Sequence, residues 1–313
     1  MASRGGLPTD YFVASQQFTR TTHHDVYPAI DPAKSSNSLA GKIVIITGAS
    51  RGIGAMGLVP SFAKAGALGL VLVARDEVKL RAVESEVHRI NPGVKTLVAP
   101  LDMTDTVAVQ ALYATIQERF GRHADVLVSN AGANTAQNGG GPSLHKASVD
   151  EWWINFEVNV KAYFIMIKYL ISSLPTPTTP VTVINISTGA IWLRYPMVDG
   201  YSVSKLAAQQ WSVLLDAAYG GSVTVVGIHP GLVATEMQTE YFSQFDQDSP
   251  LLVGGVAVWA AADAARCRFL SGRIVSANWD VDELRDRAEE IEEGDLLKMV
   301  LNGELGREQF GTS

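Results

Sequence analysis

Val44-Ile-Ile-Thr-Gly-Ala-Ser-Arg-Gly-Ile-Gly54 is the stretch of sequence that decides the fold. A short apolar run, typical of a buried strand, leads into a turn whose glycines Gly48, Gly52 and Gly54 open a helix. Glycine is needed where the backbone turns sharply and where a pyrophosphate approaches main-chain N–H groups. The spacing is not the ordinary G-x-G-x-x-G, so alone it indicates a tight strand-to-helix turn as readily as a dinucleotide site.

Outward from this turn, short β-branched runs alternate with segments of helical spacing. The predicted strands are 42–47, 69–73, 95–101, 125–129, 181–187, 222–228 and 273–276, and the predicted helices are 55–65, 76–90, 104–120, 149–172 and 201–219. Near-continuous apolar strands between helices favour a parallel sheet covered on both faces. We therefore expect one doubly wound α/β domain of the Rossmann type over residues 41–280, with a parallel sheet of about seven strands flanked by helices.

Two segments flank this predicted domain. Residues 1–40 are polar and rich in Ser and Thr, which is typical of an N-terminal arm. Residues 281–313 form an acidic tail in which Leu284, Ala288 and Ile291 lie at helical spacing. This spacing predicts a solvated helix packed by a narrow apolar stripe, or a flap that helps to close a substrate pocket.

Charge and composition exclude several classes of protein. The 313 residues carry a net charge of −7, and eight acidic residues with two arginines lie between Asp282 and Asp295. The rest of the chain is close to neutral, so no basic patch offers a footprint for nucleic acid. The single cysteine, Cys267, permits no intrachain disulfide and fits a reducing compartment. Without a signal peptide, a membrane-length apolar run or a histidine pattern for metal, we expect a cytoplasmic protein with no membrane association and no metal.

Two arginines indicate which nucleotide such a fold would bind. Arg75 follows the second predicted strand, where the adenosine ribose is placed, and Arg51 lies in the glycine turn. Two guanidinium groups suit a 2′-phosphate, so we expect NADP(H) rather than NAD(H). Either arginine could instead be a surface charge, with Asp76 as a partner for Arg75. Asp102, after the third strand, could accept from the adenine amino group.

A proton-transfer pair follows in Asp199-Gly-Tyr-Ser-Val-Ser-Lys205. The i, i+4 spacing puts Tyr201 and Lys205 on one helical face. Because an ammonium group favours the phenolate, we expect Lys205 to lower the pKa of Tyr201. The glycine turn also matches the G-x-S-x-G elbow of hydrolases through Ser50, with His229 as a later histidine. That alternative is disfavoured because it leaves the third glycine and the Tyr201/Lys205 pair unexplained.

In this order the motifs resemble the short-chain dehydrogenase/reductase family, including fungal members. The matching positions are Thr47-Gly-x-x-x-Gly-x-Gly54, Asp102, Asn130-Ala-Gly132, Asn159, Ser187/Thr188, Tyr201-x-x-x-Lys205 and Pro230-Gly231-x-Val233-x-Thr235.

The resemblance implies a role for each of these positions. Tyr201 is the expected general acid/base, Lys205 also holds the nicotinamide ribose, and Asn159 anchors a water in the proton relay. The implied cofactor-binding residues are Gly48, Ser50, Arg51, Gly52, Ile53, Gly54, Arg75, Asp102, Asn130, Ala131, Gly132, Tyr201, Lys205, Pro230, Gly231, Val233 and Thr235. Within this set, Ile53 would contact the pyrophosphate region, and Val233 and Thr235 would meet the carboxamide end of the nicotinamide. The resemblance also favours a homodimer or homotetramer built on long helices.

One position departs from the family pattern. The serine that polarises the substrate commonly lies about thirteen residues before the tyrosine, a count that falls on Thr188, whereas Ser187 lies one residue earlier. Neighbouring strand residues point to opposite faces, so only one of the two should reach the substrate, and we favour Thr188.

The expected function is reversible reduction of a ketone to a secondary alcohol with NADP(H), with Tyr201 moving the proton. Large side chains near the site predict a lipophilic substrate, although they could equally pack the core or a subunit contact: Trp192, Tyr195, Met197, Met237, Tyr241, Phe242 and Phe245. Trp152 and Trp153 indicate packing or a dimer face. Two alternatives stay open. One is a biosynthetic family member that catalyses epimerisation, dehydration or cyclisation, and the other is a catalytically silent NADP-binding regulator.

Overall fold

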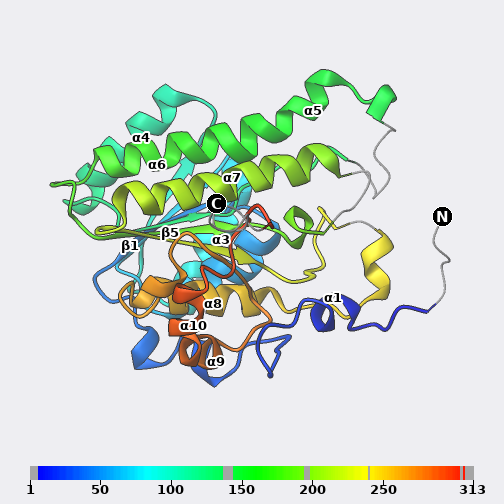
Figure 1. The fold of residues 1–313 in the computed structure, drawn as a ribbon. Helices are drawn as coiled ribbons and strands as arrows, with labels where there is room; N and C mark the ends of the chain where they lie inside the picture. The colour runs from blue at the N-terminus through cyan, green and yellow to red at the C-terminus, as the bar shows by residue number, and fades with distance from the viewer. Residues whose placement is uncertain (1–5, 137–143, 194–197, 239, 304–305, 307–313) are drawn as a thin grey trace.

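The computed structural model describes residues 6–136, 144–193, 198–238, 240–303 and 306, which form a central sheet between layers of helices (Figure 1). Within these residues the strands are β1 (Ile43–Thr47), β2 (Gly69–Ala74), β3 (Lys95–Pro100), β4 (Val126–Ser129), β5 (Val181–Ile186), β6 (Val223–His229) and β7 (Ile274–Ser276). Their order across the sheet is β3-β2-β1-β4-β5-β6-β7, and every pairing is parallel. The predicted seven-stranded doubly wound sheet is confirmed. Strand order reverses between β1 and β4, the place where open α/β sheets bind ligands.

Helices cover both faces of the sheet, which is why the strands are apolar along their whole length. On one face lie α4 (Thr106–Phe120), α5 (Val149–Phe156), α6 (Ala162–Ser172) and α7 (Asp199–Tyr219), seen above the sheet in Figure 1. The other face carries α2 (Val59–Lys64), α3 (Glu77–Ile90) and α8 (Pro250–Ala262). Alternate residues of β1 enter two separate cores. Ile43 and Ile45 pack with α4 and α6, whereas Val44 and Ile46 pack with α2 and α8.

Two of the predicted helices contain a widened, π-helical turn. The helix after the glycine turn starts with a π turn at Gly54–Leu58 and continues as α2, with Pro60 in its first turn. Proline has no N–H to donate to the preceding turn, so the irregularity precedes it. A second π turn, Glu157–Lys161, separates α5 from α6. Such turns often occur at functional sites.

The flanking segments pack against the same body. The arm contains the short α1 (Tyr11–Ala14), and the tail forms α9 (Val281–Asp286) and α10 (Ala288–Glu293). Leu284 and Ile291 are buried in the core that also holds α8. Two short helices with a break at Arg287 therefore replace the single expected helix. The apolar stripe that contains Leu284 and Ile291 packs against the core, as expected. Within the described chain, no helix combines the length and apolar character needed to cross a bilayer.

Candidate active site

Tyr201 and Lys205 lie one turn apart near the start of α7. The Lys205 side chain is buried, and Nζ donates to the carbonyl of Ile186 at the end of β5, at 2.7 Å. Burial lowers the pKa of Lys205 to about 8. The ammonium is thus still the main form at neutral pH, and it is fixed at the carboxyl end of the sheet.

Burial has the opposite effect on the neighbouring phenol. Desolvation raises the pKa of Tyr201, and a hydrogen bond with the Thr188 side chain partly offsets this. In the protein alone, the cost of burying the phenolate therefore sets the direction of the shift, and the expected lowering of the Tyr201 pKa by Lys205 stays a prediction. Tyr201 is protonated at neutral pH, which is the form required of a proton donor.

The two hydroxyls after β5 have different surroundings. Thr188 lies within hydrogen-bond reach of Tyr201, and its hydroxyl also accepts from the amide of Ala190, within the short 3-10 turn Gly189–Ile191. Ser187 is buried, and its Oγ has no hydrogen-bond partner among the described residues. Of the two candidates, it is Thr188 that lies next to the phenol.

Asn159 lies in the π turn between α5 and α6 and links the loop after β4 to α7. Its Oδ1 accepts from the amide of Ala133 at 2.8 Å, and its Nδ2 donates to the Ala133 carbonyl and to Ser204 Oγ, both at 2.9 Å. Ser204 in turn donates to the carbonyl of Tyr201. Nothing in the sequence pattern indicates this role for Ser204, which is there an ordinary helical residue. The amide of Asn159 holds the two sides of the candidate site together.

Gly132 completes this cluster because a side chain would not fit there comfortably. A Cβ atom at Gly132 would lie 3.2 Å from Asn159 Oδ1 and 3.4 Å from Lys205 Nζ. The absence of a side chain at Gly132 therefore leaves space after β4, directly beside the Lys205 ammonium group.

The glycine turn after β1 is packed against the loop after β4. Thr47, whose role the sequence did not indicate beyond its place in the motif, accepts from the amides of Asn130 and Ala131 through its hydroxyl. Asn130 Nδ2 donates to the Thr47 carbonyl at 2.9 Å. A Cβ atom at Gly54 would lie 2.1 Å from the carbonyl oxygen of Gly48, so the turn closes only with glycine at this position.

This turn fits a dinucleotide pyrophosphate. Gly48 and Gly52 have φ values of +64° and +53°, which favour glycine. A Cβ atom at Gly52 would meet described atoms only at Thr235, 3.7 Å away, so the glycine keeps the space over the turn open. The first N–H groups of the following helix have no partner within the helix. Ser50 is half-buried in the turn, whereas Ile53 packs against the core.

The segment after β6 reaches back to this turn. Gly231 has a φ of +84°, Val233 is buried, and Thr235 lies over Gly52. The structure thus brings the residues at 230–235 toward the glycine turn, with Pro230 half-buried at the start of the segment.

The two arginines expected at a 2′-phosphate are both exposed. Arg51 forms an ion pair with Glu236 at 2.7 Å. Among the described residues Arg75 has no ion pair, and Asp76 instead caps α3 by accepting from the amide of Lys79. Asp102 accepts from the amide and hydroxyl of Thr104, and these hydrogen bonds lower the pKa of its carboxyl group. Arg75 is therefore available to a ligand, whereas Arg51 is held by a carboxylate.

Only some of the residues expected to contact the substrate have contacts with one another or with the segments around the site. Phe242 and Phe245 contact the ring of Phe12 from the arm, and Trp192 contacts His229. Met237 and Tyr241 are exposed. Tyr195 and Met197 lie outside the described residues.

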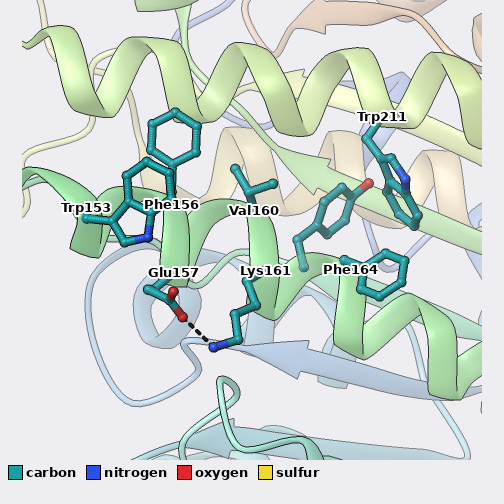
Figure 2. A pocket seen from close by; sticks show the side chains of 8 residues that line it. Trp153, Phe156, Glu157, Val160, Lys161, Phe164 and Trp211 are labelled. Atoms are coloured by element: carbon teal, nitrogen blue, oxygen red, sulfur yellow. Dashed lines mark hydrogen bonds and ion pairs between the residues drawn. The ribbon is translucent and has the colours of Figure 1, made fainter.

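A separate apolar hollow lies on the helical face shown in Figure 2. It is lined by Trp153, Phe156, Glu157, Val160, Lys161, Tyr163, Phe164 and Trp211. None of the expected catalytic residues lines it. Over the described ranges, no three His, Cys, Asp or Glu side chains gather in a group that could hold a metal ion.

Comparison with known proteins agrees with this fold. A family model described as short chain dehydrogenase matches residues 42–246. The chain is 34% identical over 289 residues to a protein named short chain dehydrogenase mpl6, from the fungus Monascus purpureus, in a match that covers 90% of this chain and 94% of that one.

Two solved structures share the fold. A 3-oxoacyl-[acyl-carrier protein] reductase from Brucella melitensis gives a TM-score of 0.69 at 23% identity, over 82% of this chain and 98% of that chain. A 7α-hydroxysteroid dehydrogenase, solved with NADH and 7-oxo glycochenodeoxycholic acid, gives 0.67 at 23% identity, over 80% and 96%.

Proposed function

The chain belongs to the short-chain dehydrogenase family of oxidoreductases, which use a nicotinamide dinucleotide, and from that premise we propose that it interconverts a ketone and a secondary alcohol on a lipophilic small molecule with NADP(H). The observation that carries the proposal is the placement of the Tyr201 phenol, within hydrogen-bond reach of Thr188 and one turn from the buried Lys205 side chain. This arrangement combines an acid, a second hydroxyl and a positive charge at one edge of the sheet.

In the direction of reduction, the chemistry supplied by a nicotinamide bound in this site would be hydride transfer. Tyr201 donates its proton to the carbonyl oxygen as charge develops there, and Thr188 donates a second hydrogen bond to the same oxygen. Lys205 uses one N–H on the Ile186 carbonyl, which leaves two donors for ribose hydroxyls. Its charge also stabilises the phenolate left on Tyr201.

The glycine turn, the 130–132 loop and the 230–235 segment would hold the cofactor. Arg75 supports the choice of NADP(H), because it is exposed at the end of β2 with no ion pair among the described residues. Arg51 would join it by exchanging Glu236 for a phosphate, which it can bind with two parallel hydrogen bonds. The steroid dehydrogenase that shares the fold was solved with NADH, so the fold by itself favours neither nucleotide.

A lipophilic substrate is supported by the aromatic side chains beside the site. Trp192 follows Thr188 by four residues, and the rings of Phe242 and Phe245, on the segment after β6, contact the ring of Phe12 in the arm. The reductase reading is favoured over a silent regulator because a protein that only binds nucleotide does not require Tyr201, Lys205 and Asn159 together.

The test is consumption of NADPH, followed by its absorbance, against a panel of lipophilic ketones and quinones. We expect turnover by the wild type and a loss of at least about 100-fold in kcat for Tyr201→Phe, which removes only the proton donor. Binding of NADPH, measured by its fluorescence, should persist in that variant, because every other implied cofactor-binding residue is kept. A Tyr201→Phe enzyme that keeps most of its turnover contradicts the mechanism, and equal rates with NADH contradict the nucleotide preference. Product structure separates reduction from epimerisation or dehydration.

The hollow in Figure 2 supports self-association as part of the same proposal. Trp153 and Phe164 are about half-exposed there, with 52% and 47% of their surface accessible. Exposed aromatic groups on neighbouring helices mark interaction surfaces. We assign this face to a contact between copies of the chain, which places the subunit interface on α5, α6 and α7 and leaves the arm side free.

A further inference from the structure

The N-terminal arm crosses the molecule on the side of the candidate site. In Figure 1 the blue α1 lies beside the yellow segment that precedes α8. A backbone hydrogen bond from Asp246 N to the Thr9 carbonyl, 2.9 Å long, joins the two segments, although these residues are 237 positions apart in the chain. The arm therefore packs on the segment that follows the cofactor-binding positions 230–235.

Gln16 contacts the loop that follows Thr188. Its Oε1 accepts from the indole N–H of Trp192 at 2.9 Å, and its Nε2 donates to the Phe12 carbonyl at 2.7 Å. A Cβ atom at Gly189, the neighbour of Thr188, would lie 3.2 Å from Gln16 Oε1. A side chain of the arm thus reaches the loop that carries the substrate-binding hydroxyl.

The rest of the arm keeps Gln16 in place. Phe12 packs edge-on against Phe245 with ring centroids 4.7 Å apart. At the far end, His24 Nδ1 and Asp248 Oδ1 are 2.6 Å apart. The other oxygen of Asp248 accepts from the amide of Leu232, which lies within the segment 230–235. Two anchors on the same segment therefore flank Gln16.

We propose that residues 7–24 form a fixed wall of the substrate pocket, and that Gln16 is a positioning residue that sets the orientation of the Trp192 indole. This inference rests on the proposed function, and it assigns substrate selection to the arm. The indole has one N–H donor, which Gln16 engages, and its ring lies edge-on to His229 at 5.8 Å. Held in this way, Trp192 gives the pocket a defined shape for a bulky lipophilic ketone. Without the hydrogen bond, the half-buried N–H has no partner and the ring reorients.

The test compares Gln16→Leu with Gln17→Leu. Leucine at position 16 has a similar size but cannot accept from Trp192. Gln17 is the matched control, because it is exposed and its side chain bonds only within the arm, to the Arg20 carbonyl. Gln16→Glu keeps an acceptor for the indole but loses the donor to the Phe12 carbonyl, so it separates the two hydrogen bonds of Gln16 and serves as the rescue variant. Hydrogen exchange over residues 189–193 and steady-state kinetics with one steroid-sized and one monocyclic ketone are measured for all three.

We expect Gln16→Leu to raise KM for the larger ketone roughly tenfold, with kcat within about twofold and KM for the smaller ketone unchanged. Exchange over residues 189–193 should become faster in Gln16→Leu, and stay at the wild-type rate in Gln17→Leu and Gln16→Glu. If Gln16→Leu does not fold, Trp192→Phe removes the same hydrogen bond from the other side and should give the same change in KM.

The inference is overturned if Gln16→Leu matches Gln17→Leu in both exchange and substrate selectivity. A different result would contradict the proposed function: wild-type protein that binds NADPH but does not oxidise it with any ketone of the panel. In that case the exchange rates over 189–193 alone decide whether the arm holds this loop.

Discussion

The hydroxyls of Ser187 and Thr188 differ in what they contact. We expect Thr188→Val to lower kcat by about 100-fold, because it removes a hydrogen bond to the developing oxyanion while keeping the shape of the side chain. Thr188→Ser keeps the hydroxyl and should retain most of the activity. Ser187→Ala should leave kcat within about twofold of the wild type, since Ser187 Oγ contacts no described polar group. Steady-state NADPH consumption measures all three.

The same comparison has a control in stability. Ser187→Ala removes a buried hydroxyl that has no partner within the described residues, so the free energy of unfolding should stay level or rise by about 1 kcal/mol. Urea denaturation measures this change. If Ser187→Ala abolished turnover and Thr188→Val did not, Ser187 rather than Thr188 would be the hydroxyl that hydrogen-bonds the substrate oxygen.

His229 gives the fold a dependence on pH. Its Nδ1 accepts from the amide of Gly189 at 3.1 Å, and burial lowers the pKa of the imidazole from 6.5 to about 4. Between these values the unfolded chain binds a proton that the folded chain does not, so stability falls as the pH drops from 6.5 toward 4. At pH 4.5 the loss from this group is about 2–3 kcal/mol.

We expect His229→Asn to lose less stability than the wild type between pH 7 and pH 4.5, because asparagine can accept from Gly189 without titrating. Urea unfolding at each pH measures the difference. His145→Asn, an exposed position, is the control and should follow the wild-type curve. Parallel curves for His229→Asn and the wild type would show that this imidazole does not set the dependence.

At the scale of secondary-structure elements, the sequence predicts the strands well because they are short β-branched apolar runs, and the amphipathic helices because their apolar residues recur at helical spacing. The run from Leu251 to Ala262 has no such spacing, since it is apolar on every side, and α8 was therefore not among the predicted helices. The π turns were not predicted either. Asn159 depends on one of them for its position, so its place in the motif could be predicted but its hydrogen bonds could not.

The buried position of α8 leads to a prediction about Gly254. A Cβ atom there would lie 2.3 Å from Ser61 Oγ and 2.4 Å from the carbonyl oxygen of Gly57. Because one of these atoms is backbone, Gly254→Ala forces α8 away from the π turn, and we expect it to lower the free energy of unfolding by about 2–3 kcal/mol. Gly221→Ala, where a Cβ atom meets nothing within 4 Å, is the matched control and should be close to neutral. Equal stability of the two variants in urea would contradict the close packing of these elements.

At the scale of the whole molecule, contacts between distant segments were the least predictable part. The arm was predicted only as a polar extension, and no pattern in it pairs His24 with Asp248 or Gln16 with Trp192. Such pairs form only because the strand order brings the segment around residue 248 next to the arm. The family motifs, in contrast, are local, so the residues around Tyr201 could be listed from the sequence while the wall facing them could not.

The exposed aromatic face of α5, α6 and α7 carries the last prediction. We expect the wild type to sediment as a dimer or tetramer, because burying Trp153, Phe164 and their neighbours removes a contiguous apolar surface from water. Phe164→Glu places a charge in that contact and should shift the protein to a single chain at micromolar concentration. Val78→Glu, at an 81% exposed position on α3 across the sheet, is the control and should leave the assembly unchanged. Sedimentation velocity measures all three. A wild type that already sediments as a single chain, or a Phe164→Glu variant that remains assembled, would place the subunit contact elsewhere or remove it.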